Sequence, residues 1–248
     1  RWALLVYAVF VTHVLLDCFT VYGTQVLWPF VTTPVGWSTV FIIDPLYTLP
    51  LLAGLLALLV LRRNPHRARR LNTAGLVLSS LYLAWTVGAK LEVERAARAS
   101  LAASGLDTAP LLSTPAPFNS LLWRVVVMTG DGYLEGFHSL LDGELPVRFS
   151  RRQSEPALLA GLQSHPPVQR LQWFTKGFYA VERVDDRVVI SDLRMGMYPD
   201  YAFRFTVGEV SNPHSRPAAP GRWRAPVDYR GRLSRVWERI WDPGVRIN

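Results

Sequence analysis

The stretch from Val40 to Ala89 decides the fold. It reads VFIIDPLYTLPLLAGLLALLVL (Val40–Leu61), RRNPHRARR (Arg62–Arg70) and LNTAGLVLSSLYLAWTVGA (Leu71–Ala89). Each apolar run has about the length that a helix needs to cross a bilayer, roughly 20 residues. The segment between them carries five arginines, and positive residues collect in cytoplasmic loops. The pattern predicts two membrane-spanning helices joined on the cytoplasmic side.

Apolar and helical patterns continue on both sides of this stretch. Trp2 to Leu16 is another apolar run, slightly short for a full span. Because the sequence begins inside this run, at Arg1, we expect an N-terminally truncated first helix. After Ala89, the alanine-rich segment Lys90–Ser104 predicts that the third helix leaves the membrane as a stalk. Residues 1–105 are therefore predicted to form a transmembrane helical domain with a stalk.

The pattern changes from Thr114 onward to short β-branched and aromatic runs bounded by Gly, Asp or Pro. The predicted strands are Leu121–Thr129, Gly132–Leu140, Gly177–Val184, Val188–Arg194 and Tyr201–Val210. Asp185 and Asp186 predict a hairpin turn, and Pro156–Phe174 is helix-like around Pro166-Pro167. The predicted fold is an α-helical transmembrane bundle plus a soluble α+β domain with an antiparallel sheet, over residues 106–248.

The C-terminal tail is proline-rich from Ser211 and then amphipathic. Apolar residues recur at helical spacing beside arginines: Leu233, Val236, Trp237, Ile240 and Trp241 next to Arg232, Arg235 and Arg239. The apolar stripe predicts a helix packed on the soluble domain. A helix lying on anionic lipid is the alternative interpretation.

The composition narrows the class of protein. Half of the residues are hydrophobic and the net charge is +8. The basic residues outside the arginine segment form no lysine-rich stripe, and no RNP-like or zinc-finger motif is present, so we expect no nucleic-acid binding. The single Cys18 excludes an internal disulfide framework and a multi-cysteine zinc site.

The orientation of the chain follows from the arginines. If the 62–70 segment is cytoplasmic, everything after the third helix lies on the outer side, together with the end of the first helix. We therefore expect a multi-pass protein of the bacterial inner membrane whose C-terminal domain faces the periplasm.

His13 and Asp17 are the main candidates for chemistry. At positions i and i+4 of a helix they share a face, about 5–6 Å apart at Cβ, and can grip one metal ion together. Ionisable side chains at the end of an apolar segment are seldom without a role. Asp44, near the start of the next span, is a possible third ligand. In the alternative interpretation, Asp17 only ends its helix and Asp44 is an N-cap followed by a proline.

The stretch THVLLDCFTVYGTQVLWPF (Thr12–Phe30) resembles the signature of the YdjM-type family of bacterial inner-membrane proteins. TPAPFNSLLWR (Thr114–Arg124) resembles the opening of the extra domain in its longer members. The family is described as metal-dependent hydrolases distantly similar to zinc-dependent phospholipase C. The resemblance implies that His13 and Asp17 are metal ligands and that Asp44 matches an acidic position opening the next helix.

The family carries further histidines and aspartates upstream, which this sequence does not contain, and two or three ligands are too few for a multi-metal cluster. We expect the rest to precede Arg1. The resulting prediction is a hydrolase that uses a divalent metal and acts on a phosphoester of a lipid or lipid-linked substrate. The expected metal is zinc. Metal-bound water would supply the hydroxide, with His13 and Asp17 as the catalytic groups.

Other side chains are weaker candidates. Thr20, Tyr22 and Gln25 could orient a substrate, although ordinary loop hydrogen bonding also accounts for them. Four polar residues of the soluble domain could face the membrane site, but sheet-edge or surface salt-bridge roles are favoured for them: Asn119, Arg124, Asp192 and Arg194. The alternative function is a non-catalytic membrane protein whose extracytoplasmic domain binds a partner or an envelope component.

Overall fold

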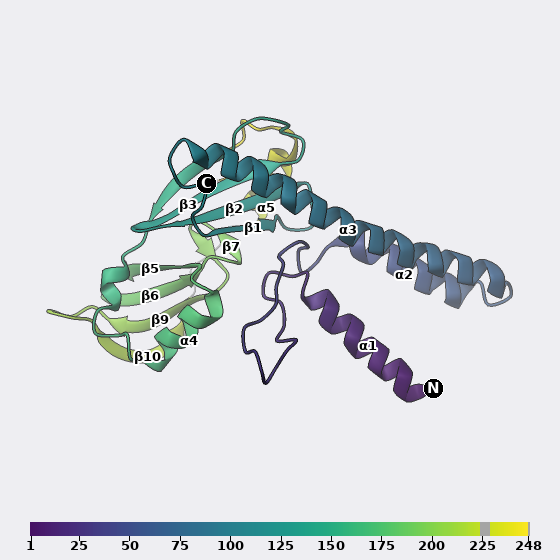
Figure 1. Ribbon diagram of the computed structural model, residues 1–248, viewed down its shortest axis with the longest axis horizontal. Coiled ribbons are helices and arrows are strands. Elements are labelled where there is room, and N and C mark those ends of the chain that lie inside the picture. Colours follow the sequence, from purple (N-terminus) through teal and green to yellow (C-terminus); the bar gives the residue numbers. More distant parts are fainter. Residues whose placement is uncertain (224–228, 248) are drawn as a thin grey trace. The chain divides into compact units, whose positions relative to one another are not determined.

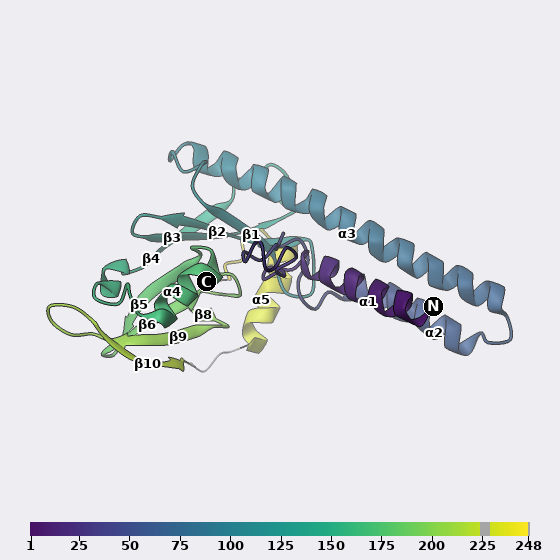
Figure 2. The same ribbon diagram turned by 60° about the horizontal axis from the view of Figure 1, so that its bottom comes forward.

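The structure is a computed structural model that describes residues 1–223 and 229–247 (Figures 1 and 2). The chain divides into two compact units. The first comprises residues 1–96, 113–123 and 139–143, and the second comprises residues 97–112, 124–138 and 144–248. The first unit holds the apolar helices, and the second holds a complete four-stranded sheet and the two C-terminal helices.

Helices α1 (Trp2–Asp17) and α2 (Pro45–Val60) have apolar side chains on all sides. Among the residues described in them, only Gly54 is buried. Phe10 is 65% exposed and Leu55 is 53% exposed. A helix that is apolar all round is stable inside a large core or in lipid. By length and composition, only α3 (Pro65–Ala102) among the described helices is long and apolar enough to cross a membrane, and α1 and α2 are shorter.

Two helix starts differ from those predicted. Helix α2 begins at Pro45 and not at Val40, because the Asp44 carboxylate accepts the first free amide hydrogens and Pro45 takes the first helical position. Helix α3 begins at Pro65, inside the arginine segment, where the Asn64 side chain accepts a hydrogen bond from the Arg67 amide at 3.2 Å. Only Arg62 and Arg63 precede α3. The continuous helix through Lys90 is confirmed.

Helices α2 and α3 form an antiparallel hairpin and lie side by side in both views (Figures 1 and 2). A Cβ added at Gly75 would lie 2.3 Å from the Pro50 carbonyl oxygen, and one at Gly54 would lie 3.0 Å from the Asn72 Cα. The Ser79 hydroxyl donates to the Tyr47 carbonyl at 2.8 Å. Small residues allow this close backbone approach, as is common between helices in membranes.

We expect Gly75→Ala to destabilise this hairpin, because its methyl group collides with backbone and not with a movable side chain. Overpacking of this kind costs about 1–3 kcal/mol. Gly88→Ala, in the same helix, is the matched control, since a Cβ there meets nothing within 4 Å and alanine favours the helix by about 0.5–1 kcal/mol. Thermal unfolding of the two variants in detergent measures the difference. Equal midpoints would contradict the close contact.

The strands form two four-stranded sheets and one two-stranded sheet. The first sheet has the order β1-β2-β3-β4 and the second has the order β10-β9-β6-β5. The strands of the first sheet are β1 (Leu111–Pro115), β2 (Leu122–Thr129), β3 (Gly132–Ser139) and β4 (Arg148–Gln153). Those of the second are β5 (Tyr179–Val184), β6 (Arg187–Asp192), β9 (Arg204–Glu209) and β10 (Arg216–Arg222). Strands β7 (Gly196–Met197) and β8 (Asp200–Tyr201) make the small sheet.

The predicted strands agree with β2, β3, β5, β6 and β9 to within a few residues, and the second sheet is antiparallel throughout. The predicted turn at Asp185-Asp186 joins β5 to β6, with Asp185 at a φ of 54°. The predicted helical segment is divided into the 3₁₀ turn η1 (Pro156–Leu159) and α4 (Pro166–Thr175). Strands β1, β4 and β10 and the short strands β7 and β8 were not predicted.

Two clusters of buried side chains make the core of the second unit. One lies between η1, α4 and the second sheet and includes Leu162, Val188 and Ile190, none of them exposed. The other includes Val126, Tyr133 and Leu193. The tail helix α5 (Tyr229–Trp241) buries Val236 and Ile240 and leaves Trp237 and Trp241 about 60% exposed. Packing on the domain therefore accounts for part of the apolar stripe.

Candidate functional site

His13 and Asp17 lie on the last turn of α1, one helical turn apart. The His13 Nε2 and the Asp17 Oδ2 are 3.6 Å apart, and the two side chains are 70% and 40% exposed. This distance is too long for a hydrogen bond between them. It is short enough for both groups to bind one cation, and their exposure leaves them accessible to it. The structure thus brings together the two residues that the sequence singled out first.

The fit of this pair to a metal is partial. A catalytic zinc is held by three protein ligands and keeps one open position. Among residues 1–223 and 229–247 no group of three or more His, Cys, Asp or Glu side chains is placed to hold a metal ion. Asp44 is accordingly not joined to His13 and Asp17 in such a cluster. Among the described residues, His13 and Asp17 are thus a pair of candidate ligands without a third beside them.

Asp44 has well-defined structural contacts. Its residue surface is 3% exposed. The Oδ1 atom accepts hydrogen bonds from the amides of Leu46 at 3.0 Å and Tyr47 at 3.4 Å, and Oδ2 accepts one from the Tyr82 hydroxyl at 2.7 Å. The alternative interpretation of Asp44 as an N-cap before proline is therefore confirmed. The same carboxylate also connects the start of α2 to α3.

Thr20 and Gln25 take part in hydrogen bonds of the loop between α1 and α2. The Thr20 hydroxyl donates to the Asp17 carbonyl at 2.8 Å and accepts from the Gly23 amide at 3.3 Å. The Gln25 side chain donates to the Thr32 carbonyl. The Tyr22 hydroxyl oxygen is buried. These contacts hold the loop together, and a role of the three side chains toward a substrate stays a prediction.

The loop that follows Asp17 is closed at its base and apolar at its tip. The Trp37 amide donates to the Cys18 carbonyl at 2.7 Å and the Thr39 amide donates to the Phe19 carbonyl at 2.8 Å. At the tip, Trp28 is 66% exposed and Phe30 is 92% exposed. Exposed aromatic side chains beside apolar helices are typical of the headgroup region of a membrane. The loop therefore places the His13–Asp17 pair beside a surface suited to lipid.

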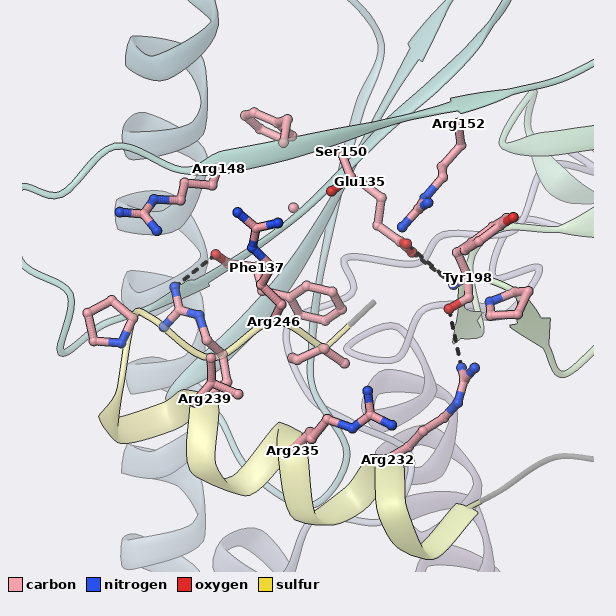
Figure 3. Close-up of a pocket in the computed structure, with 16 residues that line it drawn as sticks. Glu135, Phe137, Arg148, Ser150, Arg152, Tyr198, Arg232, Arg235, Arg239 and Arg246 are labelled. Carbon is pink, nitrogen blue, oxygen red and sulfur yellow. Dashed lines mark hydrogen bonds between the residues drawn. The ribbon is translucent and has the colours of Figure 1, made fainter.

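A second candidate site lies wholly within the second unit (Figure 3). It is a pocket of about 480 Å³ between β3, β4, α5 and the residues that follow α5. Six arginines line it: Arg148, Arg152, Arg232, Arg235, Arg239 and Arg246. Three of them, Arg232, Arg235 and Arg239, lie on the predicted tail helix, but the pocket itself was not predicted. The alternation of Arg148, Ser150 and Arg152 on one face of a strand was the available signal, and β4 was not predicted.

Two buried ion pairs in the second unit correct the prediction of surface salt bridges. Arg124 Nε donates to Glu135 Oε1 at 2.6 Å, with the two side chains 4% and 0% exposed. Arg194 donates twice to Asp192, at 2.9 and 2.7 Å, and this pair is 2% and 1% exposed. Burial disfavours the charged form of Arg124, but the Glu135 carboxylate outweighs it and the pKa of Arg124 is raised above its ordinary value.

Residues 1–93 match the model of the YdjM inner membrane protein family. The match to the YdjM family is confined to this N-terminal part of the chain. The YdjM segment covers α1, α2 and most of α3, and it contains His13, Asp17 and Asp44. No curated protein and no solved structure matches the chain.

The family is described as an inner membrane protein, and its description names no activity. It confirms the predicted family and the predicted association with an inner membrane. The arginine-lined pocket lies beyond the matched residues, in the part of the chain that the family model does not cover.

Proposed function

We propose that this YdjM family protein is a membrane-bound, metal-dependent hydrolase that acts on a phosphoester of a lipid or lipid-linked substrate at the outer face of the inner membrane. The observation that carries the proposal is the His13–Asp17 pair, 3.6 Å apart and exposed at the end of an apolar helix. We further propose that the protein is multi-pass, with α1 and α2 joining α3 in the membrane and the C-terminal part in the periplasm.

In this proposal, His13 and Asp17 hold one divalent cation through an imidazole nitrogen and a carboxylate oxygen. Bound zinc would supply a water of lowered pKa and polarise a phosphoryl oxygen. The exposed tip of the adjoining loop, with Trp28 and Phe30, would enter the headgroup region and keep the pair at that depth. A phosphoester at the lipid boundary is then within reach of the pair. The complete site requires at least one ligand more than the described residues provide.

Metal analysis of the purified full-length protein tests this function. The wild-type protein is expected to retain a divalent cation. The variant His13→Ala/Asp17→Ala is expected to contain one metal ion fewer per protein molecule, because no ligand pair remains on α1. The matched control is His66→Ala/Asp107→Ala, which removes the same two residue types at exposed positions. Equal metal content in all three proteins would reject the metal site and the hydrolase with it.

The alternative is a non-catalytic membrane protein whose extracytoplasmic part binds an envelope component. The arginine-lined pocket favours it, because it is a recess of ligand size with concentrated charge. Loss of metal only in the α1 variant supports the enzyme, whereas unchanged metal content leaves the binding protein as the better account.

A further inference from the structure

The arginine-lined pocket concentrates positive charge to an unusual degree. Its six arginines face a single acidic residue, Glu135. That carboxylate is bound to Arg124, 2.6 Å away, so its charge is already neutralised by an arginine outside the pocket lining. Like charges gathered in one recess repel each other and attract anions from solution. The lining of the pocket therefore has a large excess of positive charge over its one carboxylate.

The arginines come from two parts of the chain that are distant in the sequence, β4 and the C-terminal segment that begins with α5. Arg148 and Arg152 are on β4, Arg232 and Arg235 are on α5, and Arg246 follows α5. In Figure 3, the side chains of α5 extend toward the strand that carries Arg152, and Arg152 extends from the strand toward α5. Charges brought together by tertiary structure, and not by a local run of sequence, indicate a constructed site.

Some of these arginines have structural contacts. Arg232 pairs with Asp200 at 2.5 Å and donates to the Tyr198 carbonyl at 3.3 Å. Arg239, which is 8% exposed, donates to the Phe137 carbonyl at 3.2 Å. These contacts fix α5 over the strands. They account for two of the six guanidinium groups.

In the described part of the chain, the other four guanidinium groups have no carboxylate partner. Within residues 1–223 and 229–247, no hydrogen bond or ion pair engages the side chains of Arg148, Arg235 or Arg246. Arg152 lies 3.9 Å over the Tyr198 ring, and its Nε is buried without a hydrogen-bond partner in the same described residues. A buried donor that lacks an acceptor costs about 1–3 kcal/mol. A bound anion would satisfy it.

We propose that this pocket binds a molecule bearing a phosphomonoester or a pyrophosphate. The guanidinium group offers a planar fork of donors that matches phosphate oxygens. The volume of about 480 Å³ lies in the range of small-molecule sites. Phe137, Tyr198 and Ile247 give the lining apolar area for the rest of the ligand. The same chemistry is offered by a soluble phosphate compound and by the headgroup of an anionic lipid. The proposal is independent of the metal site on α1.

Calorimetric titration of the full chain in detergent with pyrophosphate tests the proposal. The pocket variant is Arg235→Gln/Arg246→Gln, which removes two guanidinium groups that have no structural contacts. The control is Arg187→Gln/Arg216→Gln, which removes two exposed arginines of the second sheet outside the pocket and the same net charge. We expect saturable one-to-one binding that weakens at least about tenfold in the pocket variant, since two guanidinium groups that can donate charge-assisted hydrogen bonds to phosphate are removed. The control is expected to bind within about twofold of wild type.

A second arm identifies the source of the phosphate. Native mass spectrometry with added phosphatidic acid, and with phosphatidylcholine for comparison, counts lipids retained by the same three proteins. Retention of phosphatidic acid that depends on Arg235 and Arg246, without pyrophosphate binding, supports a lipid headgroup. Pyrophosphate binding alone supports a soluble ligand. If neither probe binds, or if the control variant weakens binding as much as the pocket variant does, the proposal that this pocket binds phosphate is rejected. The metal content of the pocket variant is expected to equal that of wild type, so this test and the test of the hydrolase fail separately.

Discussion

Glu135→Gln is expected to lower the free energy of unfolding by about 3 kcal/mol or more, the largest single-residue effect that we anticipate. The substitution preserves the shape of the side chain and leaves Arg124 charged, 4% exposed and without its carboxylate. The remaining contacts of Arg124 are the Leu193 carbonyl at 2.6 Å and the Tyr201 ring at 5.5 Å, and neither carries a full negative charge. Chemical denaturation followed by circular dichroism measures the loss.

An exposed ion pair of the same first sheet provides the control. Arg151 donates to Asp131, whose side chain is 63% exposed, and this hydrogen bond lowers the pKa of Asp131. Asp131→Asn is expected to leave stability unchanged within error, because water screens an exposed pair. The variant Arg124→Met/Glu135→Leu is expected to recover most of the loss, since it removes both buried charges. A Glu135→Gln protein as stable as Asp131→Asn would contradict the buried pair.

Asp44→Ala is expected to cost about 2–3 kcal/mol, because it removes an N-cap, about 1 kcal/mol, and the acceptor for a tyrosine hydroxyl, about 1.5 kcal/mol. Asp44→Asn is expected to cost under about 1 kcal/mol, because asparagine caps helices as well as aspartate does. Thermal unfolding in detergent gives the stabilities, and hydrogen exchange at the Leu46 and Tyr47 amides reports on the cap. If Asp44 acts as the cap alone, both variants keep the wild-type metal content. Metal loss in the asparagine variant would add Asp44 to the ligands.

The helices and five of the ten described strands could be predicted because their signals are local. Apolar runs, the proline at position 45 and the turn at Asp185 depend on neighbours in the sequence. The start of α3 was placed too late because arginines suggest a loop, although they also favour helix. Strand β4 (RFSRRQ) has no buried side chain, so it lacks the apolar alternation by which a strand is recognised.

The two candidate sites also differ in whether their residues are close together in the sequence. His13 and Asp17 are four residues apart, so helical spacing alone brings them together. The arginine-lined pocket joins residues about 100 positions apart in the sequence, and their proximity depends on how α5 packs against β3 and β4. The buried Arg124–Glu135 pair was missed because charged residues are almost never fully buried unless paired, and the pairing is visible only when β2 and β3 are aligned.

The outer strand of the second sheet has a consequence for the behaviour of the protein in concentrated solution. Strand β10 lies at the sheet edge and has prolines at positions 217 and 220, with a register shift between Pro217 and Gly221. Proline has no amide hydrogen to offer to an incoming strand. A second molecule would therefore meet an interrupted row of donors along this border, which disfavours strand-by-strand growth into aggregates.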